Sequence, residues 1–174
     1  LPLGFSGSRP DPRTSTITIN REDLTVYRIV MVVLSAALRL AATAGHPKAR
    51  AAWRGRQGWR QRIKQAEQKA REAGKKGPWV HIHCASLGEY EQGAPVLNAW
   101  RERHPNTPIL LTFFSPSGID GVQDAQADHV DYLPFDLPRA MREWAGALQV
   151  SDLILIKHEP RPGLLRQCVQ GGTG

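Results

Sequence analysis

The segment Trp79–Glu91, WVHIHCASLGEYE, constrains the fold of this chain more than any other. A short apolar run, a turn of small residues and the polar start of a helix follow one another there, as in an open α/β sheet. The turn would place Glu89 at the carboxyl end of the strand, beside Ser86, Gly88 and the unpaired backbone N–H groups of the helix start. Ligands and reacting groups collect at such strand ends, so Glu89 is the first candidate for chemistry.

After Gly77-Pro78 the sequence alternates short apolar runs with helical segments. The pattern predicts strands at 79–82, 109–114, 130–133 and 153–156, and helices at 92–103, 119–125 and 138–148. Strands and helices that alternate through short connections are typical of a parallel sheet with right-handed crossovers. We therefore expect a Rossmann-like α/β fold with flanking helices over residues 78–170.

Three segments precede this region. Residues 1–22 are rich in Pro, Ser and Thr, which predicts a disordered lead-in. Residues 23–46 contain an apolar helix, and residues 47–77 form a basic helical segment with its helix at about 51–73.

The apolar helix has three open interpretations: a buried core helix, a membrane span and an interfacial anchor. Its uncharged part, Ile29–Leu38, is about half as long as a bilayer-crossing helix. We favour the anchor, because an apolar helix followed at once by a polybasic patch forms a two-signal membrane attachment. Positive charge after the helix places that side in the cytoplasm.

The net charge of +7 is concentrated in one part of the chain. Eleven Lys and Arg residues lie between Lys48 and Lys76, opposed by Glu67 and Glu72, whereas residues 77–161 are close to balanced. This local patch indicates an anionic partner. A membrane surface fits better than nucleic acid, because the patch contains no recognised groove-reading motif.

The two cysteines, Cys84 and Cys168, form neither a metal-ligand spacing nor a disulfide framework. Cys84 lies in an apolar strand, which predicts a buried free thiol. His81 and His83 alternate along the same strand and therefore share one face. Without a third ligand nearby, we expect no metal site.

Polar residues follow three of the predicted strands, in the turns Ser86-Leu87-Gly88-Glu89, Ser115-Pro116-Ser117-Gly118 and Lys157-His158-Glu159. The carboxyl ends of parallel strands meet at one edge of a sheet, so we expect these turns to converge. Glu89 can act as a general base or as a helix-start carboxylate. The SPSG turn can hold phosphate or sugar hydroxyls, although a plain turn uses the same residues. Lys157 and Glu159 can stabilise developing charge or pair with each other.

These motifs together resemble the N-terminal, acceptor-binding half of the bacterial 3-deoxy-D-manno-octulosonic acid (Kdo) transferases. The resemblance runs from about Tyr27 to Gln167. It rests on the apolar helix and on GRQGW at 55–59, HCASLGEYE at 83–91, TFFSPSG at 112–118, YLPFD at 132–136 and KHE at 157–159. It implies a membrane-associated glycosyltransferase with two Rossmann domains, of which this chain holds the first and lacks the donor-binding second. The sequence departs from the family at Pro160-Arg161, where an aromatic pair usually precedes the proline.

The resemblance also implies a reaction and a place. The family transfers Kdo from CMP-Kdo to a lipid A precursor in lipopolysaccharide biosynthesis, at the cytoplasmic face of the bacterial inner membrane, without a cofactor. The expected partners are therefore this lipid acceptor and an anionic membrane surface. We expect the acceptor domain to be inactive alone, and the alternative function is a non-catalytic module that binds anionic membranes.

Individual roles follow from the matched positions. Glu89 falls on the catalytic carboxylate that deprotonates the acceptor hydroxyl, and Lys157 on a charged residue that stabilises the transition state. The remaining matched positions would bind the phosphorylated acceptor or its sugar; they are Arg56, Ser86, Gly88, Ser115, Ser117, Gly118 and Glu159.

Overall fold

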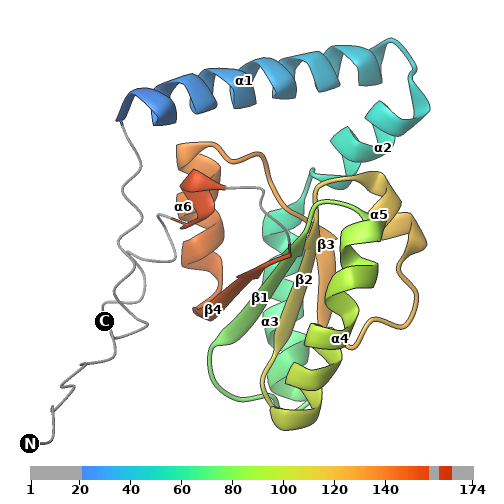
Figure 1. The fold of residues 1–174 in the computed structure, drawn as a ribbon, viewed down its shortest axis with the longest axis vertical. Coiled ribbons are helices and arrows are strands. Elements are labelled where there is room, and N and C mark those ends of the chain that lie inside the picture. The colour runs from blue at the N-terminus through green and yellow to red at the C-terminus, as the bar shows by residue number, and fades with distance from the viewer. Residues whose placement is uncertain (1–20, 157–160, 166–174) are drawn as a thin grey trace, which may run out of the picture.

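The centre of the molecule is a sheet of four parallel strands, seen in a computed structural model that describes residues 21–156 and 161–165 (Figure 1). The strands are β1 (Trp79–Cys84), β2 (Ile109–Phe113), β3 (His129–Tyr132) and β4 (Val150–Leu155), in the spatial order β3-β2-β1-β4. The register pairs Val80 with Ile109 and Cys84 with Phe113, so the carboxyl ends of β1 and β2 lie side by side. The expected Rossmann-like parallel α/β fold is confirmed.

Helices cover both faces of the sheet. α3 (Trp59–Glu72) and α6 (Pro138–Ala147) pack on one face, and α4 (Leu87–Arg103) and α5 (Pro116–Gly121) lie on the other (Figure 1). Every residue of β1 and β2 is buried because both faces are covered, which explains why most of them are apolar. The exceptions, His81, His83 and Thr112, bind one another.

The basic segment forms two helices, α2 (Pro47–Gly55) and α3, instead of the single helix expected at 51–73. The chain turns between them at Gly58, whose φ of +70° is a conformation that glycine adopts without strain. α3 then directs one apolar stripe into the core, made of Trp59, Ile63, Ala66 and Ala70. The basic helix α3 therefore contributes to the same core as the sheet.

α1 (Arg21–Thr43) lies across the carboxyl ends of the strands, and α2 returns from its end toward the sheet (Figure 1). The interpretation of the apolar segment as a buried core helix is wrong, because side chains such as Val26, Ile29 and Val33 are about 60% exposed. The stretch Leu24–Thr43 has the length and apolar composition needed to cross a membrane.

The other predicted elements are present with shifted boundaries. β4 begins at Val150, before the predicted 153, and α5 ends at Gly121. α4 begins at Leu87, five residues before the predicted start at 92. The turn residues after β1 and β2 are thus helix caps and first-turn residues, where backbone N–H groups have no partner within the helix.

Candidate active site

Glu89 lies at the carboxyl end of β1, in the first turn of α4, and is 8% exposed. Ser86 occupies the N-cap position with an extended backbone, but its side chain makes no capping hydrogen bond. The Oε2 atom of Glu89 instead accepts a hydrogen bond from the Ala85 N–H, at 2.5 Å. This bond fixes the carboxylate at the helix start, where the helix dipole favours a negative charge.

Cys84 directly precedes this turn and is a buried free thiol, as predicted. Burial, together with the negative charge of Glu89, raises the pKa of Cys84 to about 12. The thiol therefore stays protonated at neutral pH and is a poor nucleophile. Cys168 lies outside the described residues.

The SPSG turn lies beside the β1 turn, because the Ser115 N–H donates a hydrogen bond to the carbonyl oxygen of Ala85 at 2.8 Å. Ser115 is the N-cap of α5, and its Oγ accepts from the Ser117 N–H and lies 3.1 Å from the Ser117 Oγ. The structure thus brings two of the three predicted turns together at one edge.

The two glycines of these turns have different structural requirements. A Cβ on Gly118 would overlap the Phe113 ring, so this glycine allows α5 to pack closely on β2. A Cβ on Gly88 would meet no atom within 4 Å, so the backbone of this exposed residue is open to a ligand. Packing accounts for Gly118, whereas nothing in the packing requires a glycine at position 88.

The third predicted turn, Lys157-His158-Glu159, lies outside the described residues. The neighbouring Ile156 N–H donates to the His83 carbonyl oxygen, which places the end of β4 beside β1. Beyond it, the Arg161 guanidinium lies over the Phe114 ring, 4.4 Å from its centroid. Arg161, one of the two residues at which the sequence departs from the resembled family, therefore packs at the same edge.

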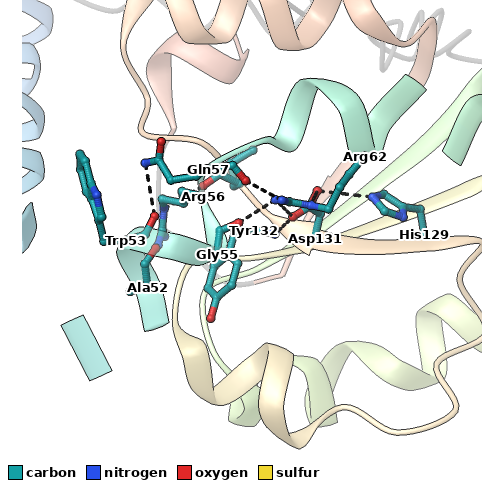
Figure 2. A network of polar contacts seen from close by, with 10 residues as sticks. Ala52, Trp53, Gly55, Arg56, Gln57, Arg62, His129, Asp131 and Tyr132 are labelled. Atoms are coloured by element: carbon teal, nitrogen blue, oxygen red, sulfur yellow. Dashed lines mark hydrogen bonds and ion pairs between the residues drawn. The ribbon is translucent and has the colours of Figure 1, made fainter. Parts of the chain in front are cut away.

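Arg56 is buried at this edge beside the Tyr132 ring (Figure 2). Its guanidinium lies within 5.0 Å of the centroids of three aromatic rings. The rings belong to Phe114, Tyr132 and Phe135. Its three nitrogens donate to the carbonyl oxygens of Ala52, Phe114 and Leu133. Burial lowers the pKa of Arg56 to about 10, so the side chain stays charged at neutral pH. Arg56 therefore fastens α2 to the ends of β2 and β3, and its contact with an acceptor stays a prediction.

A second arginine, Arg62 of α3, forms a forked ion pair with the buried Asp131 of β3 (Figure 2). Burial acts to raise the pKa of Asp131, but hydrogen bonds from His129 and Arg62 and the Arg62 charge hold it below its ordinary value. The Arg62 guanidinium also donates to the carbonyl oxygens of Gly55 and Gln57. This network ties the α2–α3 turn to the sheet.

Asp136 follows β3 and connects three distant parts of the chain. Its Oδ2 accepts hydrogen bonds from the Tyr27 hydroxyl of α1, at 2.9 Å, and from the Gly163 N–H, at 3.0 Å. Burial raises the pKa of Asp136, although both hydrogen bonds oppose that rise. Sequence reasoning gave no role to Tyr27 or Asp136. The sequence signal that could have indicated Asp136 was its position as a polar residue after a buried strand, as in the other turns.

His81 and His83 share one face of β1, as predicted. Their contacts with a single hydroxyl group show this. The Thr112 Oγ1 lies 2.8 Å from His81 Nε2 and 2.9 Å from His83 Nδ1. Burial lowers the pKa of each histidine to about 3, so both are neutral at physiological pH. Among residues 21–156 and 161–165, no group of three or more His, Cys, Asp or Glu side chains is arranged to hold a metal ion.

Comparison with known proteins identifies the relatives of this chain. A family model described as 3-deoxy-D-manno-octulosonic-acid transferase (kdotransferase) matches residues 57–173. The chain is 31% identical over 90 residues to the 3-deoxy-D-manno-octulosonic acid transferase of Haemophilus influenzae, over 51% of this chain and 21% of that protein. It is 38% identical over 64 residues to the enzyme of the same name from Chlamydia trachomatis serovar D, over 35% of this chain and 15% of that protein. No solved structure matches the chain.

The family match contains the whole sheet, the four helices that cover it, and the turns that hold Glu89 and Ser115. It covers most of the chain, whereas the alignments span only 15–21% of the length of these relatives. The chain therefore belongs to the 3-deoxy-D-manno-octulosonic-acid transferase family of glycosyltransferases.

Proposed function

We propose that this chain forms the acceptor side of a transferase that moves Kdo from CMP-Kdo to a lipid A precursor. The observation that carries the proposal is the buried Glu89 carboxylate at the carboxyl end of β1, in a member of this family. The reaction belongs to lipopolysaccharide biosynthesis at the cytoplasmic face of the inner membrane. No cofactor is required, because the nucleotide is the leaving group of the donor.

In this proposal Glu89 is the general base. The acceptor hydroxyl oxygen forms a bond to the anomeric carbon of Kdo while its proton passes to the carboxylate. The bond between that carbon and the phosphate oxygen breaks, and CMP leaves with the electron pair. The described part of the chain engages the Oε2 of Glu89 through Ala85 and offers no hydrogen bond to its Oε1, so this second oxygen is suited to take the proton.

The acceptor would lie over the two helix starts next to Glu89. The open backbone at Gly88 and the hydroxyl groups of Ser86, Ser115 and Ser117 suit sugar hydroxyls and phosphate. We assign Lys157 to stabilisation of the transition state and Glu159 to substrate binding. Gly118 acts indirectly, since it packs α5 and so positions the SPSG turn.

Kdo transfer by a chimeric enzyme tests the assignment. The chain is fused to the C-terminal half of the Haemophilus influenzae relative and assayed with labelled CMP-Kdo and a lipid A precursor. We expect transfer by the fusion, none by residues 1–174 alone, and a loss of about 10²- to 10⁴-fold in Glu89→Gln. Glu91→Gln is the matched control, because Glu91 is an exposed carboxylate two residues further along the same helix. Full activity of Glu89→Gln would refute its role as the base.

The second candidate function is a membrane-binding module without catalysis, which the exposed apolar surface of α1 favours. Vesicle flotation combined with the Kdo-transfer assay of the chimera separates the two functions. A chain that binds anionic vesicles but gives a chimera without Kdo transfer would support the module over the enzyme.

A further inference from the structure

The buried side of α4 carries Glu89, Gly93 and Leu97, which are spaced four residues apart. Residues at this spacing lie one above the other on the same face of a helix. Glu89 therefore stands on the face by which α4 packs against the sheet, one turn before Gly93 (Figure 1). How deeply its carboxylate lies at the carboxyl edge depends on how closely α4 approaches the strands.

Gly93 lies against the side chain of Ile156, at the end of β4. A Cβ atom on Gly93 would lie 2.7 Å from Cγ1, 2.9 Å from Cδ1 and 3.3 Å from Cγ2 of Ile156. These distances are shorter than the separation of about 3.5–4.0 Å at which carbon atoms attract each other. α4 can therefore approach the end of β4 this closely because position 93 has no side chain.

Ile156 has little freedom to move away from α4. Its branched Cβ restricts rotation about χ1, and both of its γ carbons lie near the position of the added atom. The Ile156 N–H donates a hydrogen bond to the His83 carbonyl oxygen of β1, at 3.0 Å. Its side chain also packs against the buried cluster between α4 and the sheet. A side chain at position 93 would therefore displace α4 rather than the end of β4.

A displacement of α4 would act directly on Glu89. The hydrogen bond from the Ala85 N–H to the Glu89 Oε2, at 2.5 Å, joins the turn after β1 to the first turn of α4. An outward shift of α4 by about 1 Å would lengthen this bond beyond the normal range for an N–H donor and an oxygen acceptor. The Ala85 N–H therefore reports the position of the Glu89 carboxylate relative to the sheet.

We propose that Gly93 is a positioning residue for Kdo transfer, because the absence of a side chain between α4 and Ile156 sets the depth at which Glu89 meets the acceptor hydroxyl. Gly93 touches no reacting group and acts through Glu89. The proposal rests on the role of Glu89 in the proposed function and adds the residue that fixes its place. A misplacement of about 1 Å can lower a rate roughly 10²-fold although every reacting group is still present.

Steady-state kinetics of the chimera test this role. Gly93→Ala is expected to lower kcat about 10- to 100-fold and to leave the KM for CMP-Kdo within about twofold, because the base moves and the donor contacts do not. Gly146→Ala is the matched control, since Gly146 is exposed in α6 and a Cβ there would meet no atom within 4 Å. Both changes raise helix propensity, so a loss confined to Gly93→Ala does not come from a weakened helix. Equal kcat in the two variants would overturn the proposal.

A second substitution tests whether the effect passes through Ile156. Ile156→Ala removes the three side-chain atoms that the new Cβ would meet. The double variant Gly93→Ala/Ile156→Ala is therefore expected to recover kcat to within about threefold of Ile156→Ala alone. A double variant as slow as Gly93→Ala would show that the contact with Ile156 does not position the base, and the proposal would fail.

Hydrogen exchange of the Ala85 amide in the full chain separates this inference from the proposed function, because it requires no substrate. Measured by NMR, this amide is expected to exchange about tenfold faster in Gly93→Ala and at the unmodified rate in Gly146→Ala and in the double variant. If the chimera without substitutions transfers no Kdo, the proposed function fails, and the exchange rate still decides whether Gly93 positions Glu89. Unchanged protection of Ala85 in Gly93→Ala would overturn that role.

Discussion

α1 and α3 differ in composition and in burial: α1 is the more apolar of the two helices, but α3 is the more deeply buried. α1 is the most apolar helix of the described chain, yet it exposes most of its large side chains. α3 has the polar sequence WRQRIKQAEQKARE, yet Ile63 and three other residues of one stripe lie in the core. Burial therefore follows the position of apolar residues around the helix and the partner that faces them, and not the mean hydropathy.

Polar contacts also attach the two helices to the rest of the molecule to different extents. Arg62 fixes α3 to the buried Asp131 of β3 through a forked ion pair, whereas Tyr27 fixes α1 to Asp136 through one hydrogen bond. We infer that α3 is part of the folding unit and that α1 is an attached element, whose Val26, Ile29 and Val33 side chains stay exposed.

Among the perturbations considered, acid is expected to lower the free energy of unfolding most. It acts through the two buried histidines in the core beneath α3 and α6. The folded pKa of about 3 for His81 and His83 lies below the ordinary 6.5, so the unfolded chain binds protons that the folded chain excludes. Stability is thus complete above about pH 6.5 and decreases as the pH falls toward 3. At pH 5 the loss is about 2 kcal/mol per histidine.

Urea unfolding curves at several pH values measure this loss. His83→Gln, which keeps a hydrogen-bonding group for Thr112, is expected to remove about half of the pH dependence. The exposed His104→Gln is expected to preserve it. Equal stability at pH 7 and pH 5 would show that the two buried histidines do not control acid unfolding.

Truncation of one apolar side chain in each helix tests the comparison directly. Ile63→Ala leaves a cavity at a fully buried position of α3 and is expected to lower the free energy of unfolding by about 3 kcal/mol. Val33→Ala changes a side chain that is 61% exposed, so we expect a change within about 0.5 kcal/mol. Chemical denaturation without lipid measures both. Similar losses in the two variants would mean that α1 is as much a part of the core as α3.

Removal of a single positive charge should have the smallest effect, and it should change only the binding of lipid vesicles. Lys48→Gln removes a cation of α2 at the carboxyl side of the sheet and is expected to weaken binding to anionic vesicles about fivefold, or about 1 kcal/mol. Lys76→Gln removes an exposed cation just before β1, at the opposite edge, and should have little effect. Flotation at fixed ionic strength compares the two variants. An equal loss in both would indicate a response to net charge rather than to a membrane-facing side.

The sheet was predictable because each strand carries its own signal. The runs at β1 and β2 are fully buried and mostly apolar, and the following turns contain Ser and Gly at the positions where helices begin. The convergence of the Glu89 and Ser115 turns followed from parallel topology alone. The start of α4 was predicted five residues too late, because Pro95 inside this helix resembles a first-turn proline.

The polar contacts at the carboxyl edge were less predictable. Arg56 was expected beside an acceptor, and its backbone bonds to Phe114 and Leu133 join residues 58 and 77 positions apart in the chain. The partners of such a side chain depend on which segments the fold brings together. No local pattern contains this information.

The sequence by itself determined the order of strands and helices, the parallel sheet, the turn that carries Glu89 and the resemblance to Kdo transferases. These features depend on local periodicity, on turn residues and on ordered motifs. Only the tertiary structure decided that α1 exposes its apolar stripe, that α3 enters the core and that Tyr27 meets Asp136 across 109 positions. The physical reason is that burial and hydrogen-bond partners are properties of contacts between distant segments, so the same apolar residue is core or surface according to what covers it.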